Sequence, residues 1–153
     1  MSIRKLQVGD TAPNFKAYTQ DNQMTELYEL LDSGNKVFLI FYPKDSTPGC
    51  TQQLCGVRDT YKEFRKRGVR VLGVNHGDSV THKKFIQKNS FPFDIIVDKD
   101  KRIIKDYGCE KKFFKNMVVK RGVFLIKEDK TIEYIFWGQQ DNQKVLDILD
   151  KNN

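Results

Sequence analysis

Two cysteines in one short stretch are the residues of this sequence best suited to chemistry. Cys50 and Cys55 lie in the segment 41–55, FYPKDSTPGCTQQLC, and the third cysteine, Cys109, stands alone farther along the chain. Thiols act as nucleophiles, redox centres and metal ligands. Because three is an odd count and the first residues of the sequence show no apolar signal core, we expect redox or metal chemistry rather than a framework of structural disulfides.

A metal site is the first alternative. The soft or borderline ligands are three cysteines and two histidines, namely Cys50, Cys55, Cys109, His76 and His82. No pair among them has the Cys-x-x-Cys or His-x-x-x-His spacing that is typical of zinc sites. The spacing therefore disfavours a metal centre, and no cofactor is expected.

The residues before Cys50 predict that it lies in the first turn of a helix. Thr47 is a good N-cap, and Pro48 suits the first helical position, so Cys50 becomes the third helical residue. Unpaired N–H groups and the positive end of the helix dipole favour an anion there, and the thiolate is the nucleophilic form of cysteine. Gly49 leaves room for a small ligand such as a peroxide. The alternative is an inert, buried thiol, because Cys50 shares a helical stripe with Leu54.

Cys55 follows Cys50 by five residues. In an intact helix this spacing puts the two Cα atoms about 8.6 Å apart. A disulfide needs a Cα–Cα distance of about 4.4–6.8 Å. If the two sulfurs bond, the first turns of the helix must therefore unwind. The alternative is that Cys55 is a small core residue without a redox role.

The surrounding pattern alternates strands and helices. Apolar runs predict strands over 37–42, 69–74, 93–97, 122–126 and 131–137. Helical spacing predicts helices over 50–64, 79–89 with Ser79 as the cap, 141–151 and, shorter, 100–107. The stretch 15–27 reads as an edge hairpin. This order predicts an α/β, thioredoxin-like fold: a central mixed sheet flanked by helices, with an N-terminal hairpin, in one domain spanning residues 1–153.

The segment 41–59 resembles the active-site motif of peroxiredoxins. Pro43, Thr47 and Cys50 have the spacing Pro-x-x-x-Thr-x-x-Cys, and Cys55 is followed by Gly-x-Arg-Asp, as in the branch called bacterioferritin comigratory protein or peroxiredoxin Q. The resemblance covers nearly the whole chain. It includes the motifs Gly-Asp-x-Ala-Pro-x-Phe at 9–15, Phe-Pro-Phe at 91–93 and Arg-x-x-Phe-Leu-Ile at 121–126.

The resemblance implies a role for each of five residues. Cys50 matches the peroxidatic cysteine, which attacks the O–O bond of a hydroperoxide and becomes a sulfenic acid, and Cys55 matches the resolving cysteine. Thr47 matches the residue whose hydroxyl bonds the peroxide, and Pro43 the residue that shields the site from water. Arg121 matches the arginine that holds the thiolate and the developing charge. Thioredoxin or a similar dithiol reductant then reduces the Cys50–Cys55 disulfide.

Three other residues leave questions open. Arg58 takes a secondary place in the motif. His76 departs from the residues usual in the family, and is either a proton donor or an ordinary loop histidine. Cys109 departs as well; it is a packed thiol unless it lies close enough to Cys50 to compete as the resolving residue.

Composition limits the other function classes. The net charge is +7, from 27 Lys and Arg against 20 Asp and Glu, but the basic residues are spread along the chain, so a nucleic-acid partner is not expected. No apolar run approaches the length of a membrane span. We expect a cytoplasmic monomer. A thioredoxin-like dithiol exchanger is the main enzymatic alternative, although such proteins normally carry Cys-x-x-Cys.

Overall fold

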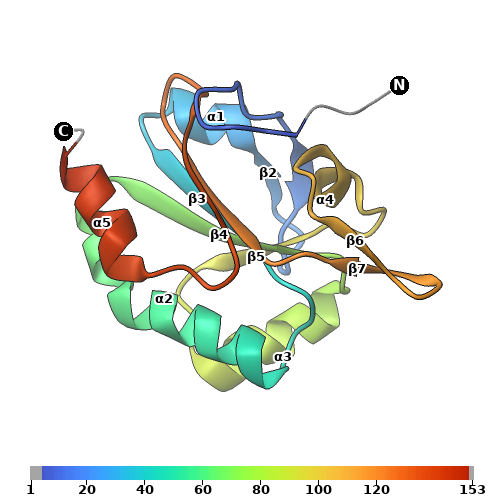
Figure 1. Cartoon of the computed structure of the whole chain (residues 1–153). Helices are drawn as coiled ribbons and strands as arrows, with labels where there is room; N and C mark the ends of the chain where they lie inside the picture. The colour runs from blue at the N-terminus through green and yellow to red at the C-terminus, as the bar shows by residue number, and fades with distance from the viewer. Residues whose placement is uncertain (1–4, 152–153) are drawn as a thin grey trace.

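A central sheet lies between two layers of helices in the computed structural model, which describes residues 5–151 (Figure 1). Its strands are β3 (Lys36–Phe41), β4 (Val69–Asn75), β5 (Asp94–Val97), β8 (Gly122–Ile126) and β9 (Ile132–Trp137), in the order β5-β4-β3-β8-β9. Strands β3, β4 and β5 are parallel, whereas β8 runs antiparallel to β3 and β9 antiparallel to β8. The predicted mixed α/β sheet is confirmed.

The middle strand brings distant parts of the sequence to one edge of the sheet. All six residues of β3 are buried, as expected of an apolar run covered on both faces. Its last residue, Phe41, pairs with Val74 of β4 and with Gly122, the first residue of antiparallel β8. The loops that follow β3 and β4 therefore lie beside the residue that precedes β8, which is Arg121.

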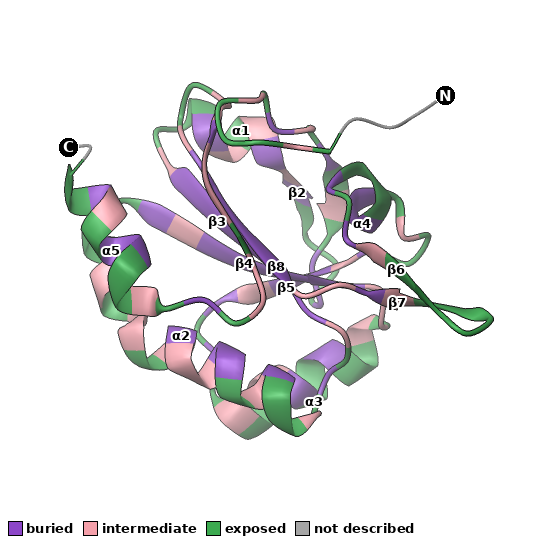
Figure 2. Cartoon of the chain, in the orientation of Figure 1, coloured by how far each residue is buried: buried purple, intermediate pink, exposed green. Residues whose placement is uncertain are grey.

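Helices cover the two faces unequally. Helices α2 (Pro48–Lys66), α3 (Ser79–Asn89) and α5 (Asn142–Lys151) lie on one face, and α1 (Leu27–Asp32) and α4 (Arg102–Asp106) on the other (Figure 1). Each layer has its own hydrophobic cluster against the sheet, and the buried stripes of the helices point inward (Figure 2). Cys50 belongs to the cluster under α2, α3 and α5, whereas Cys109 belongs to the cluster on the opposite face.

The N-terminal hairpin is confirmed, but not as an edge of the central sheet. β1 (Lys16–Tyr18) and β2 (Met24–Glu26) pair antiparallel in a sheet of their own. An isolated bridge between Thr19 and Ile96 links this hairpin to β5. Three residues per strand are enough for a turn-driven pair but leave little backbone to extend a larger sheet.

Three elements were not predicted. Helix α1 has six residues, too few to show a helical period. Strands β6 (Glu110–Phe113) and β7 (Asn116–Val119) form a hairpin that projects from the body and is exposed along most of its length (Figures 1 and 2). Its sequence is rich in lysine on both faces and therefore lacks the alternation that marks a half-buried strand.

Candidate active site

The loop between β3 and α2 sets the start of the site. Thr47 is the N-cap residue of α2 and Pro48 occupies the first turn, as predicted. The Thr47 side chain, however, makes no capping hydrogen bond; its hydroxyl donates to the carbonyl of Lys44 (2.9 Å). The predicted N-cap position is therefore confirmed, although the hydroxyl bonds within the loop rather than to the helix.

Cys50 sits in the first turn of α2 and is buried, with 1% of its surface exposed. Its Sγ lies 3.3 Å from Nη2 of Arg121, a residue 71 positions away. Gly49 adjoins this contact, since a Cβ at that position would stand 3.4 Å from the same nitrogen, at van der Waals distance. The thiol is thus covered from bulk water and lies in the first turn of α2 beside a guanidinium.

Arg121 is itself held in place by a chain of amides. Its Nη1 donates to Oε1 of Gln53, and Nε2 of Gln53 donates to Oε1 of Gln140 (2.9 Å). Gln140 in turn donates to Asn142 (2.8 Å), the first residue of α5. Both glutamines are buried, at 1% and 5% exposure. These hydrogen bonds connect the guanidinium to the first turns of α2 and to the start of α5. The arginine is therefore held in one orientation toward the sulfur.

Cys55 lies on the same unbroken helix, partly buried and reduced. Its Sγ is 3.8 Å from Oδ1 of Asn89, at the end of α3. Arg58 reaches the same end of α3, where it donates to the carbonyl of Asn89 (2.8 Å), and it also pairs with Asp59. Arg58 therefore fastens α2 to α3 and lies outside the contacts of Cys50.

Cys109 is fully buried on the far face of the sheet. Burial strongly raises the pKa of its thiol, and nearby Lys120 offsets this only in part. Its Sγ donates to the carbonyl of Tyr107 (3.7 Å). Cys109 is therefore a packed thiol on the far side of the sheet, as predicted, and does not lie close enough to Cys50 to compete as the resolving residue.

A buried polar cluster beneath the loop was missed from the sequence. The carboxylate of Asp45 accepts from the hydroxyl of Tyr42 (2.7 Å) and lies 2.5 Å from Nδ1 of His82 on α3. Asn75, at the end of β4, donates to the carbonyls of Tyr42 (2.8 Å) and Pro43 (3.1 Å). The sequence did offer one indication, namely the polar residues at the ends of β3 and β4. The carboxyl ends of neighbouring parallel strands meet at one edge of an α/β sheet.

His76 lines a pocket of about 500 Å³ beside this loop, together with Pro43, Lys44 and residues of β7. Burial lowers the pKa of His76, the charge of nearby Lys101 lowers it further, and Asp45 opposes the shift in part. Its Nδ1 is buried and has no hydrogen-bond partner among residues 5–151. The ring is therefore neutral near pH 7 and faces the pocket side of the loop rather than Cys50.

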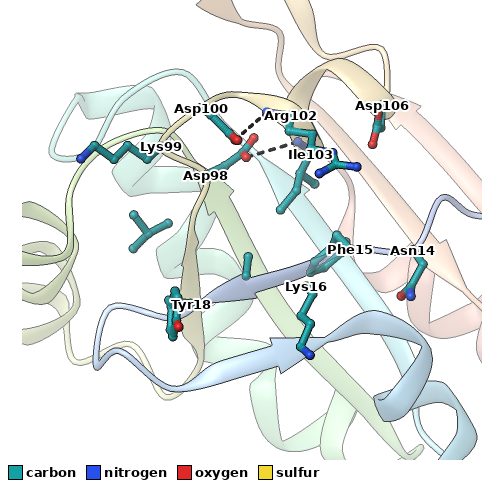
Figure 3. A pocket seen from close by; sticks show the side chains of 12 residues that line it. Asn14, Phe15, Lys16, Tyr18, Asp98, Lys99, Asp100, Arg102, Ile103 and Asp106 are labelled. Atoms are coloured by element: carbon teal, nitrogen blue, oxygen red, sulfur yellow. Dashed lines mark hydrogen bonds between the residues drawn. The ribbon is translucent and has the colours of Figure 1, made fainter.

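A larger pocket, of about 740 Å³, lies away from the cysteines between β1, β5 and α4 (Figure 3). Its buried acid, Asp98, accepts from the N–H groups of Ile103 (3.2 Å) and Ile104 (2.8 Å). Desolvation raises the pKa of Asp98, and these two bonds oppose the rise. Its carboxylate thus serves to start α4, and no cysteine lines the pocket.

Within residues 5–151, no group of three or more His, Cys, Asp or Glu side chains is arranged to hold a metal ion. No helix in the same range has the length and apolar character needed to cross a membrane.

Comparison with known proteins places this geometry in a family. Residues 8–135 match the AhpC/TSA family. A putative peroxiredoxin bcp of Coxiella burnetii is 39% identical over 135 residues, which cover 86% of this chain and 88% of that protein. The chloroplastic peroxiredoxin Q of Oryza sativa subsp. japonica is 33% identical over 140 residues, which cover 92% of this chain and 63% of the rice protein.

Solved structures agree with the sequence relatives. The crystal structure of peroxidoxin BcpB from Mycobacterium tuberculosis superposes with a TM-score of 0.89 at 26% identity, covering 97% of this chain and 99% of that one. A bacterioferritin comigratory protein of Xanthomonas campestris gives a TM-score of 0.80 at 25% identity, with 90% and 91% covered.

The thioredoxin-like sheet with Cys50 at the start of the helix after its central strand agrees with the peroxiredoxin relatives, and the chain belongs to the AhpC/TSA family. Within it, the chain falls in the bacterioferritin comigratory protein and peroxiredoxin Q branch. Peroxiredoxins are thiol peroxidases, so the predicted class of activity is confirmed.

Proposed function

We propose that Cys50 is the residue that reduces the hydroperoxide. Its thiolate attacks one oxygen of the O–O bond and becomes a sulfenic acid, and the other oxygen leaves as an alkoxide or hydroxide that takes up a proton. The observation that carries this assignment is the 3.3 Å contact between Sγ of Cys50 and the Arg121 guanidinium in the first turn of α2. Donors fixed at the place where charge develops stabilise the transition state strongly.

Thr47 and Pro43 complete the proposed site. Because the Thr47 hydroxyl gives its hydrogen to the Lys44 carbonyl, its oxygen keeps lone pairs that can accept a hydrogen bond from the O–H of a hydroperoxide. Pro43 is half-buried at the entry of the loop and has no N–H for water to bind. Thr47 thus orients the substrate, and Pro43 limits the access of water to the thiolate.

Cys55 is the proposed resolving residue. Its thiol attacks the sulfenic sulfur of Cys50, which forms the disulfide and releases water. Both cysteines lie within α2, so this step requires the start of the helix to unwind. Unwinding separates Cys50 from Arg121 and Gln53 from Gln140. The locations of the two sulfurs favour Cys55 over Cys109, which lies across the sheet.

The remaining assignments concern the reductant, the location and the oligomeric state. We infer that thioredoxin or another dithiol reductant reduces the Cys50–Cys55 disulfide by thiol exchange. We further propose one peroxiredoxin domain over residues 1–153 that acts as a cytoplasmic monomer, without a nucleic-acid or membrane partner. Sedimentation of the reduced and oxidised protein tests the oligomeric state.

Peptide mapping by mass spectrometry after one equivalent of hydrogen peroxide tests the chemistry. We expect a Cys50–Cys55 disulfide in the wild type, no consumption of peroxide by Cys50→Ser, and a trapped sulfenic acid in Cys55→Ser. Cys109→Ser is the matched control and is expected to form the normal disulfide. A Cys50–Cys109 bond, or full recycling of Cys55→Ser by thioredoxin, would contradict the assignment.

A further inference from the structure

The active-site loop carries one buried charge that the proposed chemistry does not use. Asp45 lies between Pro43 and Thr47, and its side chain is 3% exposed. Both carboxylate oxygens have partners: Oδ1 accepts from Tyr42 (2.7 Å), and Oδ2 lies 2.5 Å from Nδ1 of His82, whose side chain is fully buried. A buried carboxylate is retained only where such bonds replace water, so these contacts hold the loop in one position.

The imidazole is held from two sides. A carboxylate can only accept, so Nδ1 of His82 carries a hydrogen toward Asp45. Nε2 faces the carbonyl of Asn75 at 3.4 Å, which is also an acceptor. The side chain of Asn75 in turn binds the carbonyls of Tyr42 and Pro43. His82 therefore links α3, the end of β4 and the active-site loop.

The next residue along the loop explains why such fastening is needed. Ser46 has a φ of +65°, in the left-handed region that a residue with a side chain avoids. Such a conformation costs about 1–3 kcal/mol and persists where the surroundings impose it. Ser46 stands directly between Asp45 and Thr47, so the direction in which the chain enters α2 depends on where Asp45 is held.

We propose that Asp45 and His82 are a positioning pair that sets the Thr47 hydroxyl and the first turn of α2 for peroxide attack by Cys50. Neither residue contacts Sγ of Cys50; they act by holding the loop through Asp45 and the backbone turn at Ser46. This inference rests on the proposed role of Cys50 and adds to it two residues that determine the alignment of the peroxide rather than the reactivity of the sulfur.

Two reactions of Cys50 separate alignment from reactivity. Attack on hydrogen peroxide requires Thr47, whereas alkylation by iodoacetamide requires an accessible thiolate and no peroxide-binding group. For Asp45→Asn and His82→Gln we expect the second-order rate with hydrogen peroxide to fall by about 100-fold, the scale of a misplaced reacting group. The alkylation rate of Cys50, followed by peptide mapping, should change less than threefold, or about 0.7 kcal/mol. Asp45→Ala should lose more than Asp45→Asn, because Asn can still accept from Tyr42 or His82.

Asp98→Asn is the matched control, since Asp98 is also a buried aspartate and its carboxylate accepts from the N–H groups that begin α4 rather than from the active-site loop. It is expected to lower the thermal midpoint while leaving the ratio of the two rates at the wild-type value. Equal losses in both reactions of Asp45→Asn and His82→Gln would overturn the inference, as would rates that match the wild type. If the wild-type protein does not react with peroxide through Cys50, the proposed function itself is wrong. This result differs from the two outcomes that would overturn only the role of Asp45 and His82.

Discussion

Arg121 lies within 3.3 Å of the sulfur of Cys50, and the sheet brings them together from positions 71 residues apart. Strand β8 begins at Gly122 opposite the last residue of β3, so its preceding residue meets the helix that follows β3. The pairing of the two strands is therefore part of the active site. A change in that register would separate the cation from the thiol while leaving both residues in place in the sequence.

Replacing Arg121 by Ala should slow the reaction of Cys50 with hydrogen peroxide by about 100- to 1,000-fold, as expected when a fixed donor is removed from developing charge. Arg121→Lys should recover part of the rate, because lysine keeps the charge but cannot bond Gln53 and Cys50 together in one plane. Stopped-flow measurement under single-turnover conditions gives the rates.

Lys120→Ala is the control for this series. Lys120 adjoins Arg121 but places its ammonium 4.1 Å over the ring of Trp137, outside the contacts of Cys50. It should react with peroxide at the wild-type rate. If Lys120→Ala and Arg121→Ala lose similar activity, the effect of Arg121 is one of general surface charge rather than of contact.

Gln140→Ala should speed formation of the disulfide after peroxide attack. The substitution leaves Nε2 of the buried Gln53 without its partner, at a cost of about 1–3 kcal/mol to the wound form of α2. The start of the helix then unwinds more readily, and we expect roughly tenfold faster disulfide formation, since about 1.4 kcal/mol is a factor of ten. Mass spectrometry should also show less sulfinic acid at high peroxide. An unchanged rate would indicate that unwinding does not break the Gln53–Gln140 contact before the rate-limiting step.

Cys109 should resist alkylation in the folded protein. Burial raises the pKa of its thiol, so the reactive thiolate does not form at mildly alkaline pH. N-ethylmaleimide, followed by peptide mapping, should label Cys55 readily and Cys109 only after denaturation. Labelling of native Cys109 at the rate of Cys55 would show that the far side of the sheet opens to solvent.

The pair Arg67–Asp150 predicts a loss of stability in acid. Arg67 donates to both carboxylate oxygens of Asp150 (2.7 and 3.0 Å), and this bonding is the largest cause of the lowered pKa of Asp150. A lowered carboxyl pKa adds stability above the unfolded pKa of about 3.9, and that stability is lost as pH falls through the folded value. Asp150→Asn should therefore reduce the free energy of unfolding slightly at neutral pH and not at all in strong acid. Urea titrations at the two pH values measure the difference; an equal deficit at both would mean that packing, not charge, is responsible.

The sequence predicted those elements whose burial leaves a strong pattern. Strand β8 begins and ends at the predicted residues. Helix α2 begins at Pro48, as its N-cap and proline predict, and runs two residues beyond Phe64, where the predicted apolar stripe ends. The cap of α3 was misplaced by one residue: Asp78, not Ser79, accepts from Thr81, and a carboxylate also suits the helix dipole. Short or exposed elements such as α1 and the β6–β7 hairpin leave no such period.

The sequence predicted only those parts of the site whose residues lie close together in the chain or match a known family motif. The placement of Cys50 in the first turn follows from Thr47 and Pro48 alone. The Asp45–His82 contact joins residues 37 positions apart on a loop and a helix, so no local spacing could reveal it. The direction of the Thr47 hydroxyl depends on the turn at Ser46, a backbone choice that the residue type does not dictate.

Leu54, one residue before Cys55, is fully buried in the cluster beneath α2. If the start of the helix unwinds to form the proposed disulfide, this side chain leaves the interior together with the sulfur. Oxidation would then expose an apolar patch next to the disulfide, which the reduced protein keeps buried. The reductant would then recognise the oxidised enzyme by its exposed apolar surface, although the oxidised and reduced forms have the same amino-acid sequence.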